Sequence, residues 1–260
     1  MRLISKALVT ACMITAFGSS TVTASVVDIY DGFEGGTYVY PTLNSYFSGQ
    51  GYTVNQLTAS FTSLAGANLA ILSDPEGFGS AQLSAIDSYV NGGGRLIINS
   101  DGTNFEAAQT GVNNILTSLG SSIVNVDAGY DVGYHNTTNV VSGPFTAGVT
   151  SINYGYTSYL TGGTPVAYGI SGQLFIAYQQ IGAGYVFAIA DFNTADSTTF
   201  TGDNPTLYCD FGGLSCGGSA TATPLPTAAP LFATGLAAMG LFGWRRKRKA
   251  ARTMLPFAAA

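Results

Sequence analysis

A fully apolar run near the carboxyl end constrains this chain most. Residues 228–244 carry no charged side chain, and a run of this length lies at the short end of the roughly 17–25 residues that cross a bilayer as a helix. Five consecutive cations follow it: Arg245, Arg246, Lys247, Arg248 and Lys249. Such a block stays on the cytoplasmic side of a membrane. The sequence therefore predicts one transmembrane helix over 228–244 and a basic cytoplasmic tail over 245–260, rather than a buried core helix.

A short proline turn stands in front of this run, formed by Pro224, Leu225 and Pro226. The order of proline turn, apolar helix and basic block resembles the PEP-CTERM sorting signal of Gram-negative bacteria. The residue between the prolines is Leu225 instead of the usual Glu, so the motif is a Pro-Leu-Pro variant. The resemblance implies that an exosortase is a partner and cleaves near these prolines. It also implies transfer from the inner membrane to the cell surface or the extracellular matrix, often in producers of exopolysaccharide.

The amino end indicates export. Arg2 and Lys6 precede an apolar stretch over 7–17, and small residues lead up to Ala24. This order is typical of a secretory signal peptide, so we expect residues 1–24 to engage the general secretion machinery and to be cut after Ala24. The body of the protein is then exported and held at the inner membrane by its tail before processing.

Charge is scarce and strongly segregated in this sequence. Charged residues make up 9% of the chain, against about 25% in an average globular protein. All fourteen acidic residues lie between Asp28 and Asp210, where Arg95 is the one basic residue, giving a net charge of −13 over that span. Such a body repels nucleic acid and is compatible with divalent cations or basic partners, although acidity also simply keeps a protein soluble. No motif predicts a cofactor.

Apolar periodicity predicts an α/β domain over 25–205. Continuous apolar runs indicate strands over 25–30, 52–57, 64–73 and 95–99, and helical spacing indicates helices over 41–47, 80–90 and 104–119. This alternation favours a mostly parallel sheet covered on both faces. The second half is broken by Gly, Asn and Thr, and shorter strands are expected over 123–126, 140–141, 164–168, 173–178 and 184–189. Residues 206–227 are predicted to be a cysteine-containing loop and linker.

The order of elements resembles the class I glutamine amidotransferase-like superfamily, which has a flavodoxin-like three-layer sandwich fold. The residues that carry the resemblance are 70–73, 83–94, 96–98, 146–149 and 181–191. Active members of that superfamily place a nucleophilic Cys on a tight turn after a strand, with a His partner. The matching turn in this chain reads Ser100, Asp101, Gly102 and contains no Cys.

Two residues are candidates for catalysis. Ser100 lies where an elbow nucleophile would stand, but Ile98 occupies the first glycine position of a G-x-S-x-G motif. A serine nucleophile also needs a base, and His135 is the sole histidine of the chain. The alternative is that Ser100 and Asp101 cap the helix that follows.

Cysteines and carboxylates suggest structural sites. Cys209 and Cys216 are expected to form a disulfide in an oxidising compartment. Loose carboxylate clusters provide weak candidates for a calcium site, with loop acids in solvent as the alternative. Their members are Asp28, Asp31, Glu34, Asp127 and Asp131.

Two classes of function follow from these features. The first is a non-enzymatic cell-surface or matrix protein, associated with polysaccharide through tyrosine-rich loops. The second is an extracellular hydrolase of carbohydrate or ester substrates that uses Ser100 and His135. A small polar ligand would sit at the carboxyl ends of the parallel strands. The loop tyrosines considered for stacking on sugar rings are Tyr130, Tyr134, Tyr154, Tyr156 and Tyr159.

Overall fold

The computed structural model describes residues 25–102, 106–126 and 128–217 of the 260. Most of these belong to a compact unit that ends at Leu214. The predicted signal peptide, the Pro-Leu-Pro motif, the apolar run and the basic block all lie outside the described residues. Within the described part, every helix is too short or too polar to cross a bilayer.

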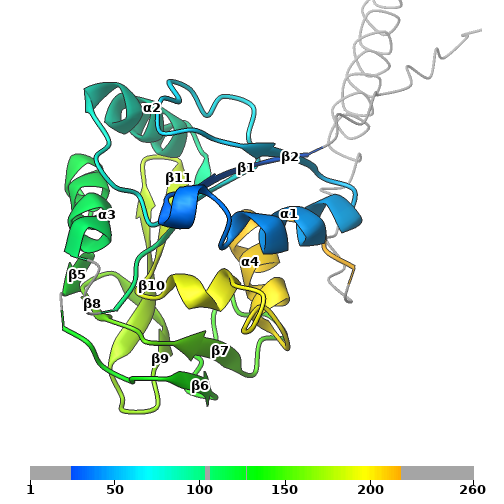
Figure 1. Ribbon diagram of the computed structural model, residues 1–260, viewed down its shortest axis with the longest axis vertical. Coiled ribbons are helices and arrows are strands. Elements are labelled where there is room, and N and C mark those ends of the chain that lie inside the picture. Colours follow the sequence, from blue (N-terminus) through cyan, green and yellow to red (C-terminus); the bar gives the residue numbers. More distant parts are fainter. Residues whose placement is uncertain (1–24, 103–105, 127, 218–260) are drawn as a thin grey trace, which may run out of the picture. The chain divides into compact units, whose positions relative to one another are not determined.

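A seven-stranded, mostly parallel sheet forms the centre of the domain (Figure 1). Its spatial order is β2-β1-β3-β4-β11-β10-β9, and the first five strands run parallel to one another. Strands β10 and β9 extend this sheet as an antiparallel edge. The strand bounds are β1 (Val26–Asp31), β2 (Thr53–Gln56), β3 (Leu69–Ser73), β4 (Arg95–Asn99), β9 (Thr164–Tyr168), β10 (Leu174–Ile181) and β11 (Gly184–Ile189).

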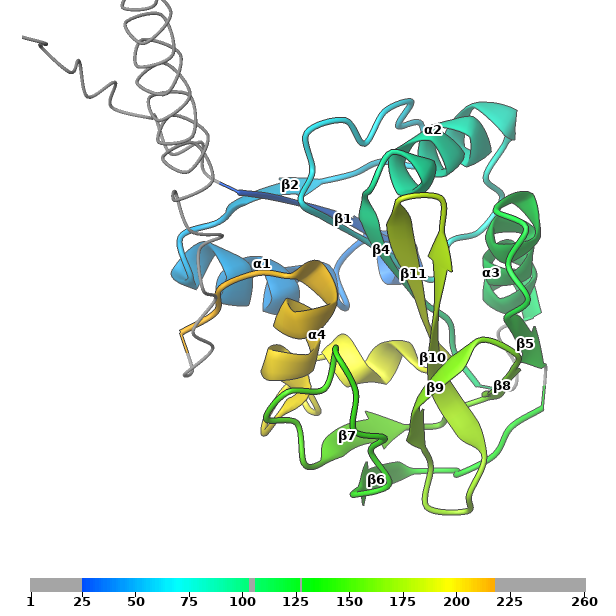
Figure 2. The same ribbon diagram turned by 180° about the vertical axis from the view of Figure 1, so that it is seen from behind.

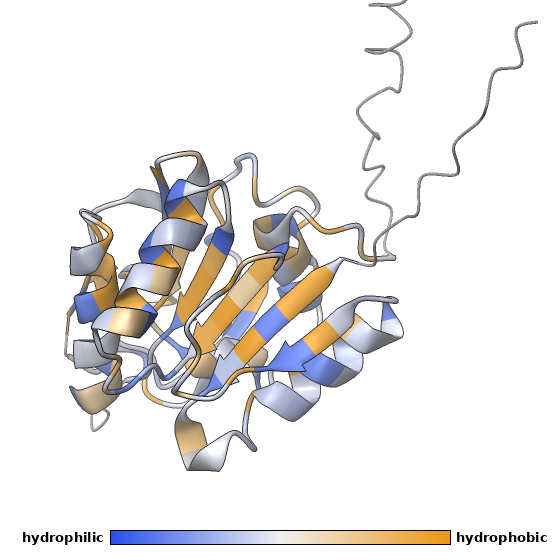
Figure 3. Ribbon diagram, turned by 90° about the horizontal axis from the view of Figure 1, so that it is seen from above, coloured by the Kyte–Doolittle hydropathy of each residue, from blue (hydrophilic) through white to orange (hydrophobic). Residues whose placement is uncertain are grey.

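The central strands are apolar because helices cover both faces of the sheet. Every residue of β3 is buried, and β4 is buried from its second residue onward. Figure 3 shows these central strands as largely hydrophobic. Strands buried on both sides read as continuous apolar runs rather than as alternating patterns, which is the feature that predicted them.

Four helices cover the sheet: α1 (Tyr40–Gly49), α2 (Ser80–Asn91), α3 (Glu106–Ser118) and α4 (Asn204–Gly212). Helices α2 and α3 pack beside each other, whereas α1 and α4 lie together on the opposite face (Figures 1 and 2). The Tyr46 hydroxyl of α1 contacts the Cys209 sulfur of α4 at 3.3 Å. The fold is therefore a mixed α/β domain with a mostly parallel sheet, as predicted.

An insertion between α3 and β9 builds two small antiparallel sheets. Strand β5 (Val124–Val126) pairs with β8 (Tyr159–Thr161), and β6 (Tyr134–Thr137) pairs with β7 (Ile152–Gly155). Sequence periodicity indicated β5 but not β6, β7 or β8, because these strands are three or four residues long and rich in Asn, Tyr and Gly. The expected strand at 140–141 is reduced to a single bridge between Val140 and Ala167.

The prediction of a loop from residue 206 onward is wrong at its start, because helix α4 extends to Gly212. Its residues Leu207, Tyr208 and Phe211 are fully buried. The Phe211 ring stacks on Phe187 of β11 with centroids 4.3 Å apart and an interplanar angle of 14°. The predicted disulfide between Cys209 and Cys216 is confirmed, and its first cysteine belongs to this helix.

Phe211→Ala is expected to lower the free energy of unfolding by about 3–5 kcal/mol, because it empties a filled core position. Chemical denaturation followed by circular dichroism measures this change. Val124→Ala, at an exposed position of β5, serves as the control and should change stability by less than about 0.5 kcal/mol. A Phe211→Ala protein as stable as the control would show that α4 is not part of the core.

Candidate functional site

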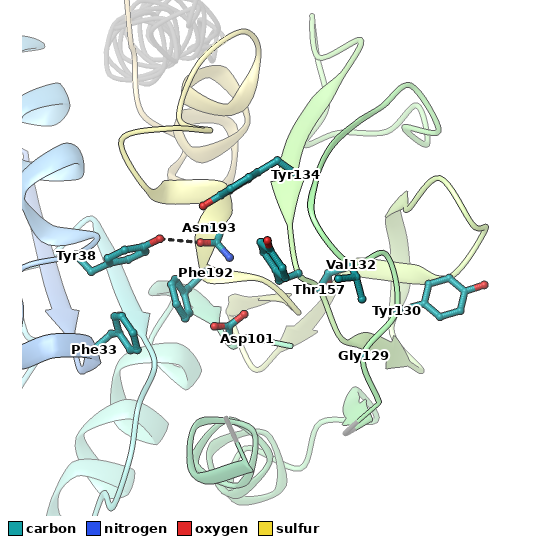
Figure 4. A pocket seen from close by; sticks show the side chains of 11 residues that line it. Phe33, Tyr38, Asp101, Gly129, Tyr130, Val132, Tyr134, Thr157, Phe192 and Asn193 are labelled. Carbon is teal, nitrogen blue, oxygen red and sulfur yellow. Dashed lines mark hydrogen bonds between the residues drawn. The ribbon is translucent and has the colours of Figure 1, made fainter. Parts of the chain in front are cut away.

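A cavity of about 480 Å³ lies at the carboxyl ends of the parallel strands. Phe33 follows β1, Asp101 follows β4, and Phe192 and Asn193 follow β11. This edge is where ligands bind in doubly wound sheets. In Figure 4, Phe33 and Tyr38 lie on one side of Asp101, with Val132 and Tyr130 on the other. The insertion supplies the remaining lining residues: Gly129, Tyr130, Val132, Tyr134, Tyr156 and Thr157.

Aromatic rings form the walls of this cavity. The Tyr38 ring stands nearly perpendicular to Phe33 and to Phe192, at 77° and 88°, with both centroid distances 5.1 Å. Tyr134 and Tyr156 form a second perpendicular pair at 5.6 Å. Edge-to-face packing of this kind is the preferred geometry between aromatic rings. Aromatic rings from the ends of β1 and β11 and from the insertion therefore line one cavity.

Two glycines allow the loops around the cavity to approach closely. A Cβ at Gly102 would lie 1.9 Å from the Tyr156 carbonyl oxygen, and a Cβ at Gly32 would lie 2.0 Å from that of Asp74. Tyr156 and Asp74 both have positive φ angles, 55° and 50°. A bulky residue in this left-handed region stores strain, and such strain concentrates at functional sites.

Burial raises the pKa of three carboxyl groups at this edge of the sheet. The pKa of Asp101 rises to about 7, mainly by desolvation and further by the charge of Asp74. Desolvation likewise raises the pKa of Asp74 to about 6. The pKa of Asp191, which is fully buried, is raised well above its usual value by desolvation and by Asp101. Clusters of perturbed carboxyls in a cavity are typical of functional sites.

Asp191 fastens the insertion to the end of β11. Its carboxylate accepts hydrogen bonds from the backbone N–H of Gly155 at 2.7 Å and of Asn193 at 2.7 Å. The Asn193 side chain donates to the Gly155 carbonyl and accepts from the Tyr38 hydroxyl. Three distant segments thus meet behind the cavity wall.

Several buried polar atoms beneath the cavity have no hydrogen-bond partner among the described residues. They are Ser73 Oγ, Asp74 Oδ1, Asn99 Oδ1 and Gln109 Oε1. Ser73 and Asn99 end the neighbouring strands β3 and β4 and face each other in register. A buried polar group without a hydrogen-bond partner lowers the stability of the folded state. Because several such groups lie at one edge of the sheet, we interpret this edge as a site whose polar character reduces stability.

The structure does not bring Ser100 and His135 into one cavity. Ser100 is fully buried, and its Oγ accepts a hydrogen bond from the Asn125 side chain. His135 contacts the Val132 carbonyl at 3.0 Å through Nε2 and lines a separate hollow of about 450 Å³. The Asp101 carboxylate accepts from Gly102 N–H rather than from a described N–H of α3. Among the described residues, neither side chain accepts a hydrogen bond from a backbone N–H of α3, and residues 103–105 in front of that helix lie outside the described part.

The calcium candidates have other roles or lie outside the described residues. Asp31 binds the backbone N–H of Tyr38, Val39 and Tyr40 at the start of α1. Asp28 accepts from the Asn55 side chain, and Asp131 accepts from the Tyr154 and Ser171 hydroxyls. Asp127 and the side chain of Glu34 are outside the described part. Among described residues, no three His, Cys, Asp or Glu side chains are grouped to hold a metal ion.

Of the five loop tyrosines, Tyr130, Tyr134 and Tyr156 line the cavity. Tyr154 is instead buried against Asp131, and Tyr159 packs its ring on Tyr130. Sequence reasoning missed Phe33, Tyr38, Phe192 and Asn193, and it assigned Asp101 only a capping role. The signal for most of them is present, because Asp31-Gly32-Phe33 and Asp191-Phe192-Asn193 each follow a buried strand.

Comparison with known proteins gives information on the fold alone. No family model and no curated protein matches the sequence. Among solved structures, the mmIFT52 N-terminal domain aligns with a TM-score of 0.54 at 14% identity, covering 72% of this chain and 94% of that one. A cytoplasmic protein from Salmonella typhimurium aligns at 0.50 and 12%, covering 73% and 98%. A glutamine amidotransferase from Thermotoga maritima aligns at 0.45 and 11%, covering 65% and 76%.

Asp101→Asn is expected to remove part of the pH dependence of stability. A carboxyl whose pKa is raised on folding contributes stability that is present below about pH 4 and lost as the pH rises through about 7. The variant should therefore be more stable than the parent at pH 8, by up to about 4 kcal/mol, and equal to it near pH 4. Urea denaturation at several pH values measures this, with Asp87→Asn as the control. Parallel stability curves for Asp101→Asn and the parent would contradict the assigned pKa.

Proposed function

We propose that this chain is an exported, non-enzymatic protein of the cell surface or extracellular matrix, and that its α/β domain binds a segment of polysaccharide. The aromatic cavity at the carboxyl ends of the strands carries this proposal. The strand order β2-β1-β3-β4-β11 is that of flavodoxin-like sheets and supports a three-layer, glutamine amidotransferase-like fold without the nucleophilic Cys.

The lining of the cavity suits a polyhydroxylated ligand. Ring faces pack on the C–H surfaces of sugar rings, and the carboxyl group of Asp101 borders the cavity, where it can bond a hydroxyl group. The volume of about 480 Å³ is within the range of small-molecule sites. A carbohydrate chain meets both requirements.

Export is supported by the two ends of the sequence. The signal-peptide pattern over 1–24 and the Pro-Leu-Pro, apolar and basic segments over 224–249 carry it. Processing by an exosortase would release the body from the inner membrane to the surface or the surrounding exopolysaccharide.

No specific observation favours the alternative of a hydrolase that uses Ser100 and His135. Ser100 Oγ is buried against Asn125, and the two residues line no common cavity. Nucleophile and base must lie within hydrogen-bond reach. If the purified protein hydrolyses a sugar or ester, loss of that activity in both Ser100→Ala and His135→Ala would restore this interpretation.

Tyr134→Ala is expected to weaken binding of the host's purified exopolysaccharide by about fivefold to tenfold. The ring is about half exposed and lines the cavity, and an aromatic contact contributes about 1–1.5 kcal/mol. Surface plasmon resonance on the immobilised polymer measures the affinity. Tyr40→Ala, at the start of α1 and outside the cavity, should bind as the parent does. If the parent and both variants bind with equal affinity, the polysaccharide binds outside the cavity. If the parent does not bind the polysaccharide, the proposed function is wrong.

The mature protein is expected to begin at Ser25 and to end near Pro226. Mass spectrometry of its two termini, from separated membrane and culture fractions of the native host, measures this. Recovery of that form in the surface or released fraction would support sorting. A tail that is found intact and only in the membrane would instead indicate a plain single-span anchor, and the exosortase would no longer be a partner.

A further inference from the structure

We propose that the ligand of this cavity carries a positive charge, and that within the proposed function it is a polysaccharide with free amino groups. The ammonium group would lie against the aromatic walls beside Asp101. This inference rests on the proposed function for the polymer, but the cation site itself stands on the cavity.

The charge around the cavity is one-sided. Its lining contains no Lys, Arg or His among the described residues and includes one carboxylate, Asp101. Asp196 lies directly behind the wall, where it accepts from the Tyr38 hydroxyl at 3.1 Å, and Asp191 lies close to Asp101. Anionic ligands are therefore disfavoured, and a cation gains from each of these carboxyls that is ionised.

The one basic residue of this span is engaged elsewhere. Arg95 donates to the carbonyl oxygens of Asp210 and Phe211 at 3.1 and 3.0 Å. Its guanidinium also lies 5.5 Å from the Phe145 ring centroid and 5.7 Å from that of Tyr185. Asp210 and Phe211 belong to α4, Tyr185 belongs to β11, and Phe145 lies between β6 and β7. None of these residues lines the cavity. Among the described residues, no Lys or Arg side chain therefore neutralises the negative charge at the cavity.

The lining of the cavity is rich in aromatic rings. Phe33, Tyr38 and Phe192 come from the ends of β1 and β11, and Tyr134 and Tyr156 come from the insertion. A ring face attracts an ammonium group, and each such contact contributes about 0.5–2 kcal/mol. The aromatic lining therefore suits a cation beside Asp101.

Asp101 leaves one oxygen for the ligand. The side chain is 3% exposed and borders the cavity, and its Oδ1 accepts from Gly102 N–H at 2.6 Å. Its Oδ2 accepts no hydrogen bond from a described residue. A buried carboxylate without a full set of partners is costly, and an ammonium group is the partner that relieves this cost best.

The test compares two oligosaccharides of equal length, glucosamine hexamer and N-acetylglucosamine hexamer, which differ in the charge of the amino group. Binding to the purified full-length protein is measured by isothermal titration calorimetry at low salt. We expect the glucosamine hexamer to bind at least about tenfold more tightly, and Asp101→Asn to abolish this preference. Asp87→Asn, which removes a carboxylate of α2 outside the cavity, should keep it.

Tetramethylammonium serves as a second probe because its charge does not change with pH. Its affinity should rise between pH 6 and pH 8, because Asp101 ionises in this range and the neighbouring Asp74 after β3 ionises near its lower end. The other neighbouring carboxyl, Asp191 after β11, has a pKa raised further by burial. In Asp101→Asn this rise should shrink. Protein stability is not an obstacle, since this variant is expected to be the more stable one at pH 8.

Each outcome separates the cation site from the polysaccharide function. Equal or tighter binding of the N-acetylated hexamer, or a preference that survives Asp101→Asn, overturns the cation inference and leaves polysaccharide binding in place. Binding of tetramethylammonium without either hexamer, joined with failure on the host polymer, keeps the cation site and overturns the polysaccharide. Failure of every probe overturns both.

Discussion

The whole domain depends on satisfying its carboxylates without cations. Fourteen acids share the span from 28 to 210 with a single arginine, so neutral N–H and O–H donors take the place of salt bridges. Asp31 collects three backbone N–H groups at the start of α1, and Asp203 accepts from Thr150 and Ser151 in the insertion. The hydrogen bonds from Thr150 and Ser151 lower the pKa of Asp203, and each bond to these carboxylates fixes a loop.

The same constraint positions the candidate site. Asp191 at the end of β11 can be buried only because Gly155 and Asn193 donate to it, and this ties the insertion over the sheet edge. The aromatic walls come from both sides of that junction. Burial raises the pKa values of Asp101 and Asp74 as well, and Asp74 Oδ1 has no hydrogen-bond partner among the described residues. Buried carboxyls that are only partly satisfied therefore gather at the candidate site.

The sequence predicted the elements in which apolar residues form a continuous run or recur at helical spacing. The strands β1, β3, β4 and β11 are apolar runs, and α2 shows helical spacing of its apolar residues. The short strands β6 to β8 and helix α4 depend on tertiary contacts, such as the Phe187–Phe211 stack, that leave no local pattern. The site was missed for a related reason, because Tyr38, Asp101 and Phe192 become neighbours only once the sheet is assembled.

The scarcity of basic residues also determines how a bound ligand would change the stability of the folded domain. If the group bound beside Asp101 is an ammonium, it supplies the charge that the chain itself lacks at this edge. Binding to the folded state alone stabilises that state by mass action, and here the gain would grow as Asp101 ionises. Gly102, which follows Asp101, lies so close to the Tyr156 carbonyl that a Cβ would clash there, so the insertion packs tightly against the end of β4 beside the cavity. A fold that keeps an unbalanced carboxylate in a preformed aromatic cavity gives up stability when empty and recovers it when a cation is bound.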